Sequence, residues 1–77
     1  MTDRQIRVLQ ELRKQAAERR RWDFTLQEFA DAVLAAGVLA EATNESTRRG
    51  VVRDIRNQLA NKKIIAVDGK AETVRLQ

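Results

Sequence analysis

The chain contains no cysteine and no histidine, and in a chain of 77 residues this absence narrows the possible folds. A hydrophobic core this small supplies only about 3–5 kcal/mol of net stability, so small domains often add disulfides or structural zinc. Without cysteine or histidine, the stability must come from packed helices and strands. Hydrophobic residues make up 43% of the sequence, which suits a folded domain. We therefore expect one soluble domain over residues 1–77, with no cofactor and no metal.

Two capping boxes predict where two helices begin. In each box, a threonine hydroxyl and a side-chain oxygen three residues later satisfy free backbone N–H groups. The boxes pair Thr2 with Gln5 and Thr25 with Glu28. The first box precedes apolar residues at helical spacing, which predicts a helix over about residues 3–20. The second helix is expected to run from Leu26 to a stop at Gly37, with an inner face of Leu26, Phe29, Ala30, Val33 and Leu34.

A third helix is expected from a cap at Thr43 or Asn44 to about Ala60, with Asn61 as a left-handed terminator. Its inner face is predicted to consist of Val51, Val52, Ile55 and Leu59. The segment Trp22-Asp23-Phe24 alternates between apolar and polar residues, which indicates a very short strand. We expect Trp22 to lie in the core, and base stacking by Trp22 is the alternative.

The apolar period changes after the third helix. Residues 64–67 are β-prone and residues 73–76 alternate, and the turn signal Asp68-Gly69-Lys70 lies between them. This pattern predicts a C-terminal β-hairpin. An isolated hairpin is marginally stable in water, so we expect it to pack on the helices. The expected fold is therefore α+β and mainly helical, with three helices and a hairpin.

The predicted order of helix, short strand, helix, turn, helix and hairpin resembles that of winged helix-turn-helix domains. The resemblance extends over nearly the whole chain. Residues 24–30 resemble the entry into the second helix of such domains, and residues 56–65 resemble the end of their recognition helix running into the wing. It implies that the second and third helices form the helix-turn-helix, that the hairpin is the wing, and that double-stranded DNA is the partner.

Charge is distributed unevenly along the chain. Fifteen basic and eleven acidic residues give a net charge of +4. Residues 1–21 carry seven basic and three acidic groups, a net of +4, whereas residues 22–43 carry four acidic groups and no basic one. Residues 44–77 carry eight basic and four acidic groups, again +4. Eleven of the cations are arginine, whose guanidinium makes bidentate contacts with phosphate and guanine.

The third predicted helix places polar residues opposite its apolar side on a helical wheel. Arginine donates twice to guanine, asparagine pairs with adenine, and serine contacts base or phosphate. Gly50 on the same side would allow close approach of the backbone, although a plain solvated helix face has a similar composition. Two lysines between helix and hairpin and one at the hairpin tip are candidates for backbone contact. The predicted nucleic-acid-binding residues are Ser46, Arg48, Arg49, Arg53, Arg56, Asn57, Lys62, Lys63 and Lys70.

These features favour a DNA-binding protein, either a small transcriptional regulator or a phage- or plasmid-type accessory factor. A single module covers little surface, so a homodimer is a candidate arrangement. The alternative is a protein-interaction module that docks through the acidic residues Glu28, Asp31 and Glu41. RNA binding is a further candidate, and an enzyme is not expected, because serine and threonine lack a histidine base. With no small-molecule ligand, membrane segment or apolar leader evident, we expect a cytoplasmic location.

Overall fold

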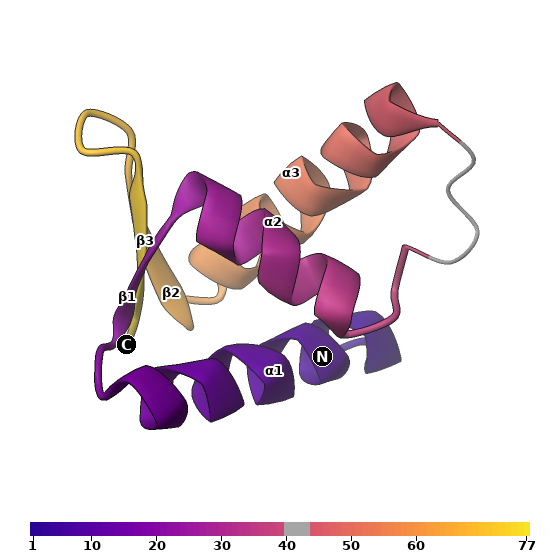
Figure 1. The fold of residues 1–77 in the computed structure, drawn as a ribbon. Helices are drawn as coiled ribbons and strands as arrows, with labels where there is room; N and C mark the ends of the chain where they lie inside the picture. Colours follow the sequence, from indigo (N-terminus) through magenta and orange to yellow (C-terminus); the bar gives the residue numbers. More distant parts are fainter. Residues whose placement is uncertain (40–43) are drawn as a thin grey trace.

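The computed structural model describes residues 1–39 and 44–77, and it contains three α-helices and three β-strands. The helices are α1 (Asp3–Arg19), α2 (Leu26–Ala35) and α3 (Glu45–Asn61), and the strands are β1 (Asp23–Thr25), β2 (Ile65–Asp68) and β3 (Thr73–Leu76). The predicted class, α+β and mainly helical with a C-terminal hairpin, is confirmed. Figure 1 shows α1 and α3 on either side of α2, with the sheet at one end of the helices.

Both predicted capping boxes are present. At the start of α1 the Gln5 N–H donates to Thr2 Oγ1 at 3.2 Å, and the Thr2 N–H donates to Gln5 Oε1 at 3.2 Å. The corresponding distances between Thr25 and Glu28 at the start of α2 are 3.0 and 2.9 Å. Each box satisfies two backbone N–H groups that a helix end would otherwise leave unpaired.

The helix ends differ in part from the sequence predictions. Helix α1 ends at Arg19, where Arg20 adopts a left-handed cap with φ 56. Gly37 follows α2 with φ 76, as expected of a glycine stop. The prediction that Asn61 ends α3 in a left-handed conformation is wrong, because Asn61 is the last helical residue and the left-handed residue is Lys63, with φ 60. The alternative cap Thr43 lies outside the described residues, and Asn44 caps α3.

One hydrophobic cluster joins all the elements. Phe24 and Phe29, which flank the α2 cap, are both buried in it. The apolar stripe of α1 and the predicted inner residues Ile55 and Leu59 of α3 belong to the same cluster. Leu34 was predicted to face inward, and this is wrong: it is 55% exposed. The buried residues of α2 are Phe29, Ala32 and Val33, so Phe29 and Val33 are confirmed as inner residues and Ala32 is buried although it was not predicted to be.

The three strands form an antiparallel sheet in the order β1-β3-β2. Phe24 pairs with Val74, and Val74 pairs with Val67 across the hairpin. The prediction that Trp22 belongs to the core is wrong, since it is 56% exposed. Trp22 lies just before β1, where its carbonyl oxygen accepts from the Leu76 N–H at 2.9 Å. Its backbone therefore extends the sheet while its side chain remains largely in solvent.

Candidate nucleic-acid interface

Helix α3 presents its polar face to solvent because its apolar residues anchor the opposite face. Asn44 caps it, with Oδ1 accepting from the Thr47 N–H at 2.8 Å. Ile55 and Leu59 are buried, and Val51 and Val52 pack against the core at its margin. The predicted outward residues Ser46, Arg53 and Asn57 are exposed.

Gly50 lies on this outward face, in a shallow hollow that it shares with Glu45, Ser46, Arg49 and Arg53. A Cβ placed on Gly50 would meet no atom within 4 Å. The structure therefore gives no packing reason for a glycine here. The missing side chain lowers the surface of α3 at that point.

The α3 arginines differ in their surroundings. Arg49 donates to Glu45 at 2.8 Å, and Arg53 Nε lies 3.9 Å from Asp54 Oδ1. Side chains in both pairs are at least 66% exposed, so these ion pairs contribute little to stability. Arg56 is half-buried and Arg48 is exposed.

A groove of about 480 Å³ separates α2 from α3. Its apolar lining includes Leu34 and Val52, and the α3 side carries Arg48, Arg49, Arg53 and Arg56. The sequence predicted these four arginines as binding residues. It did not predict that apolar side chains such as Leu34 line the groove beside them. The helical period alone predicts that Leu34 faces the core, and only the packing of α2 shows that its side chain is exposed.

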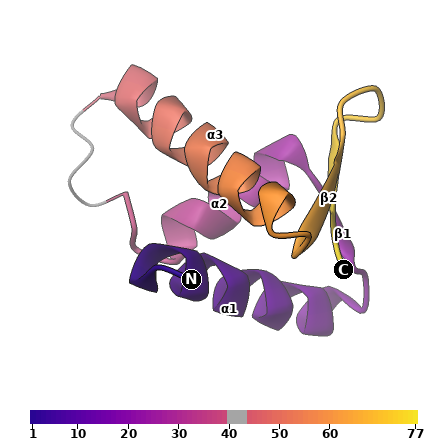
Figure 2. The same cartoon turned by 180° about the vertical axis from the view of Figure 1, so that it is seen from behind.

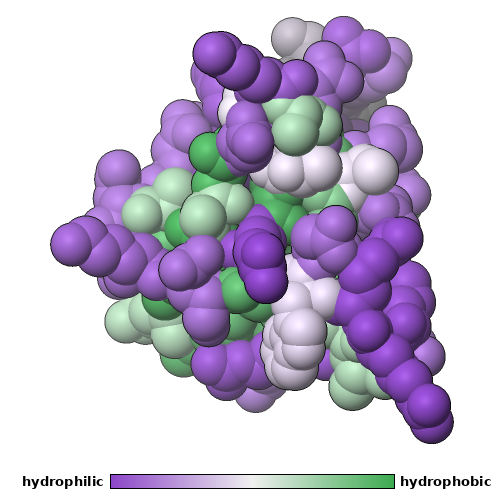
Figure 3. Space-filling view, turned by 90° about the vertical axis from the view of Figure 1, so that its left-hand side faces the viewer, coloured by the Kyte–Doolittle hydropathy of each residue, from purple (hydrophilic) through white to green (hydrophobic). Residues whose placement is uncertain are grey.

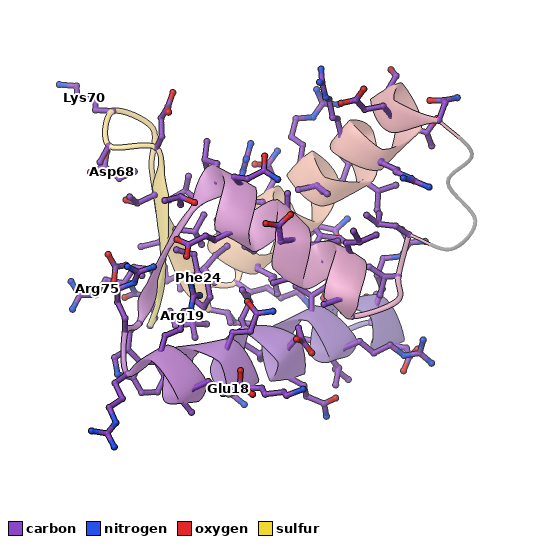
Figure 4. The ribbon with its side chains drawn as sticks, viewed as in Figure 1. Glu18, Arg19, Phe24, Asp68, Lys70 and Arg75 are labelled. Atoms are coloured by element: carbon purple, nitrogen blue, oxygen red, sulfur yellow. The ribbon has the colours of Figure 1, made fainter. Side chains whose placement is uncertain are left out.

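The hairpin loop, residues 69–72, is built on Asp68. Its Oδ1 accepts from the backbone N–H groups of Lys70 at 3.0 Å and Ala71 at 3.1 Å. Glu72 takes a left-handed conformation with φ 53 before β3 begins. Lys70 extends away from the body of the molecule at the tip of this loop (Figure 4).

The fold brings the hairpin loop and the N-terminal half of α3 to the same side of the molecule. The loop and the start of α3 lie on the side away from α1 in Figure 1, and the view from behind in Figure 2 shows the same arrangement. Lys62 and Lys63 are exposed, but they precede β2 and lie at the end of that strand opposite the loop. Lys70 and the N-terminal half of α3 therefore share the side of the molecule away from α1, at opposite ends of it in Figure 1, whereas Lys62 and Lys63 lie at the base of the hairpin.

The acidic residues of α2 are largely engaged within the chain. Glu28 accepts from Arg21 Nη2 at 2.8 and 3.0 Å, forms an ion pair with Arg19, and also accepts from the Thr25 N–H. The hydrogen bond from that N–H is the main cause that lowers the pKa of Glu28, and the nearby Arg19 and Arg21 lower it further against the opposing effect of burial.

The acidic docking surface predicted as the alternative to DNA binding also includes Asp31 and Glu41. Asp31 accepts from Gln27 Nε2 at 3.0 Å, and Glu41 lies outside the described residues. Among the residues that the structure describes, no group of three or more acidic side chains is arranged to hold a metal ion.

Arg19 supports this region from α1. Its guanidinium lies 4.4 Å from the centre of the Phe24 ring, a cation–π contact between two side chains that Figure 4 labels. The same guanidinium pairs with Glu28. It thereby joins the end of α1 to β1 and α2. The arginine triplet at residues 19–21 is thus partly structural, since Arg21 also pairs with Asp23 at 3.6 Å.

No family model, curated protein or solved structure matches this chain. None of the helices in the described part is long and apolar enough to span a lipid bilayer.

Proposed function

We propose that this protein binds double-stranded DNA, with α3 in the major groove and the hairpin loop on the backbone or minor groove. The observation that carries the proposal is that the hairpin loop and the N-terminal half of α3, where Ser46, Arg49 and Arg53 are exposed, both lie on the side of the molecule away from α1 (Figures 1 and 2). A helix enters the major groove only if one long face is free of packing, and the outward face of α3 meets this condition.

The side chains on that face suit direct reading of bases. Arg53 is exposed and only loosely paired with Asp54, so its guanidinium is available for bidentate donation to guanine. Asn57 lies one helical turn further on and offers both a donor and an acceptor to adenine. Gly50 lies between Ser46 and these residues, where a bare backbone permits close approach to the duplex.

In this proposal the arrangement is a winged helix-turn-helix in which α2 and α3 form the helix-turn-helix and β2 with β3 forms the wing. The sheet order β1-β3-β2 supports it, because β1 holds the hairpin against the helices. A small transcriptional regulator or accessory factor is the role we propose for such a module. We favour DNA over docking through acidic α2 residues, because Glu28 is occupied by contacts within its own chain.

The direct test is a titration of labelled duplex DNA, followed by fluorescence anisotropy, at a series of salt concentrations. Each phosphate contact contributes about 0.9 to the slope of log affinity against log salt. We expect Arg53→Ala to weaken binding by roughly tenfold or more, since a good base contact is worth about 1–3 kcal/mol. Lys70→Ala should lower the slope of log affinity against log salt by about 0.9, the value for one phosphate contact. It should reduce the affinity by a similar factor for every DNA sequence.

The matched control is Arg13→Ala. Arg13 is an exposed cation on α1, the helix on the side of the molecule away from the hairpin loop (Figure 1). It removes the same charge as Arg53→Ala, and we expect no comparable loss of affinity. Equal losses from both variants would show a non-directional charge effect and would refute binding through α3. Binding that hardly responds to salt would refute the whole proposal.

A further inference from the structure

We infer that the outer face of the sheet, around Trp22, is a contact surface for a second copy of this chain. A hollow on this face is lined by residues from all three strands and from the segment that follows α1. Seven of them carry the argument and define what we call the Trp22 face: Arg20, Arg21, Trp22, Asp23, Ala66, Asp68 and Arg75. The inference does not depend on DNA binding.

The apolar part of the Trp22 face is the first observation. Trp22 is 56% exposed, in a chain that buries its other aromatic residues, Phe24 and Phe29. Ala66 is also exposed, and it pairs with Arg75 in the strand register, so it shares the outer side of the sheet. Figure 3 views the molecule from this side and shows green and pale side chains reaching the surface between purple ones. Tryptophan and arginine dominate the binding energy of protein interfaces, and this face combines them.

Charge of both signs is the second observation, and it selects the partner. Arg20 and Arg75 make no ion pair within the described ranges. On the same face, Asp23 pairs with Arg21 at 3.6 Å, and Asp68 uses Oδ1 to accept from the hairpin loop. Arg75 extends from the side of the sheet opposite the helices in Figure 4. A two-fold dimer joins one surface to itself, so the surface must carry both charges to be complementary to itself. A nucleic acid on this face would bring its phosphates toward two carboxylates as well as three arginines, whereas a second copy of the chain presents charges of both signs.

The strand register explains why these side chains share a face. Asp23 pairs with Arg75 across the β1–β3 ladder, while the next pair, Phe24 with Val74, is buried. Alternate residues of a strand point to opposite sides, so burial of Phe24 and Val74 directs Asp23 and Arg75 outward. The apolar area is modest, and small interfaces are typical of weak association, so we expect a dimer that dissociates on dilution.

The test uses the full chain without DNA. Sedimentation equilibrium over a wide range of protein concentration should show reversible dimer formation. Trp22 is the only tryptophan, so its fluorescence reports on this face alone. We expect its emission to shift to shorter wavelength, and its quenching by acrylamide to fall, over the same concentration range in which the mass doubles.

Two variants and a control complete the experiment. Trp22→Ser and, independently, Ala66→Lys should each weaken dimer formation at least tenfold while leaving the circular dichroism spectrum unchanged. Leu34→Ser is the control, because Leu34 is 55% exposed but lies on α2. It should leave the dimer intact.

Three outcomes would overturn the inference. The first is a protein that remains monomeric at every concentration. The second is a dimer that forms with no change in Trp22 emission. The third is quenching of the monomer's Trp22 by a short single-stranded oligonucleotide, which would assign this face to base stacking instead.

Discussion

Two glycines with equally open surroundings are expected to respond to alanine in opposite directions. A Cβ built on Gly50 or on Gly37 meets no atom within 4 Å, so neither substitution creates a clash. The positions differ in backbone conformation. Gly50 is inside the 17-residue helix α3, whereas Gly37 has φ 76.

The magnitudes follow from this difference. Glycine in a helix interior costs about 0.5–1 kcal/mol relative to alanine, so Gly50→Ala should stabilise the fold by that amount. A left-handed backbone costs a residue with a Cβ about 1–2 kcal/mol, so Gly37→Ala should destabilise it. In a domain of this size, about 1 kcal/mol corresponds to a shift of roughly 4–8 °C in Tm. The two variants should therefore differ by roughly 6 °C or more.

Thermal and urea denaturation followed by circular dichroism measure both variants against the parent chain. The same Gly50→Ala protein is then titrated with duplex DNA. If α3 approaches DNA closely at Gly50, the added methyl group should reduce affinity although the fold is more stable. Contact with DNA would thus account for a glycine at a position where packing requires none.

The result that would refute this reasoning is a Gly50→Ala protein that is less stable than the parent. It would show that the outward side of α3 is packed or that the helix is broken there. An unchanged stability of Gly37→Ala would contradict the left-handed stop after α2. A stabilised Gly50→Ala protein with undiminished affinity would contradict close approach of α3 to DNA.

Two further predictions concern stability. Because the hydrogen bond from the Thr25 N–H and the nearby arginines lower the pKa of Glu28, its carboxylate stabilises the fold above its unfolded pKa, and this contribution is lost as pH falls through the folded pKa. Glu28→Gln should therefore lower the free energy of unfolding at neutral pH and reduce the loss of that free energy toward acid pH, as measured by urea denaturation at a series of pH values. An unchanged loss toward acid pH would contradict the assignment. Gln5 is 4% exposed and its Nε2 donates to Gln58 Oε1 at 2.6 Å, so Gln5→Ala should cost about 1–2 kcal/mol in urea denaturation. Gln58→Ala should cost less because Gln58 is exposed, and equal losses would show that the cap contributes nothing.

The sequence was sufficient for features that depend on neighbours in the chain. The capping boxes join residues three positions apart, so the starts of α1 and α2 followed from local chemistry alone. The inward side of α3 followed from the period of its apolar residues, and its outward residues followed from the same period. The hairpin was also predicted, since both strands and the turn between them are continuous in the chain.

Only the tertiary structure shows which apolar side chains are buried in the core and where the hairpin lies relative to α3. Trp22 and Leu34 fit the apolar pattern as well as their neighbours, yet both are exposed, because a small core is filled by the side chains that pack most closely. The pairing of Phe24 with Val74 joins residues far apart in the sequence, and no local signal specifies it. That pairing holds the hairpin beside the helices and brings its loop to the same side as α3. Local hydrogen bonds and periodicity act over a few residues, whereas these decisions depend on the volume and shape available to the whole chain.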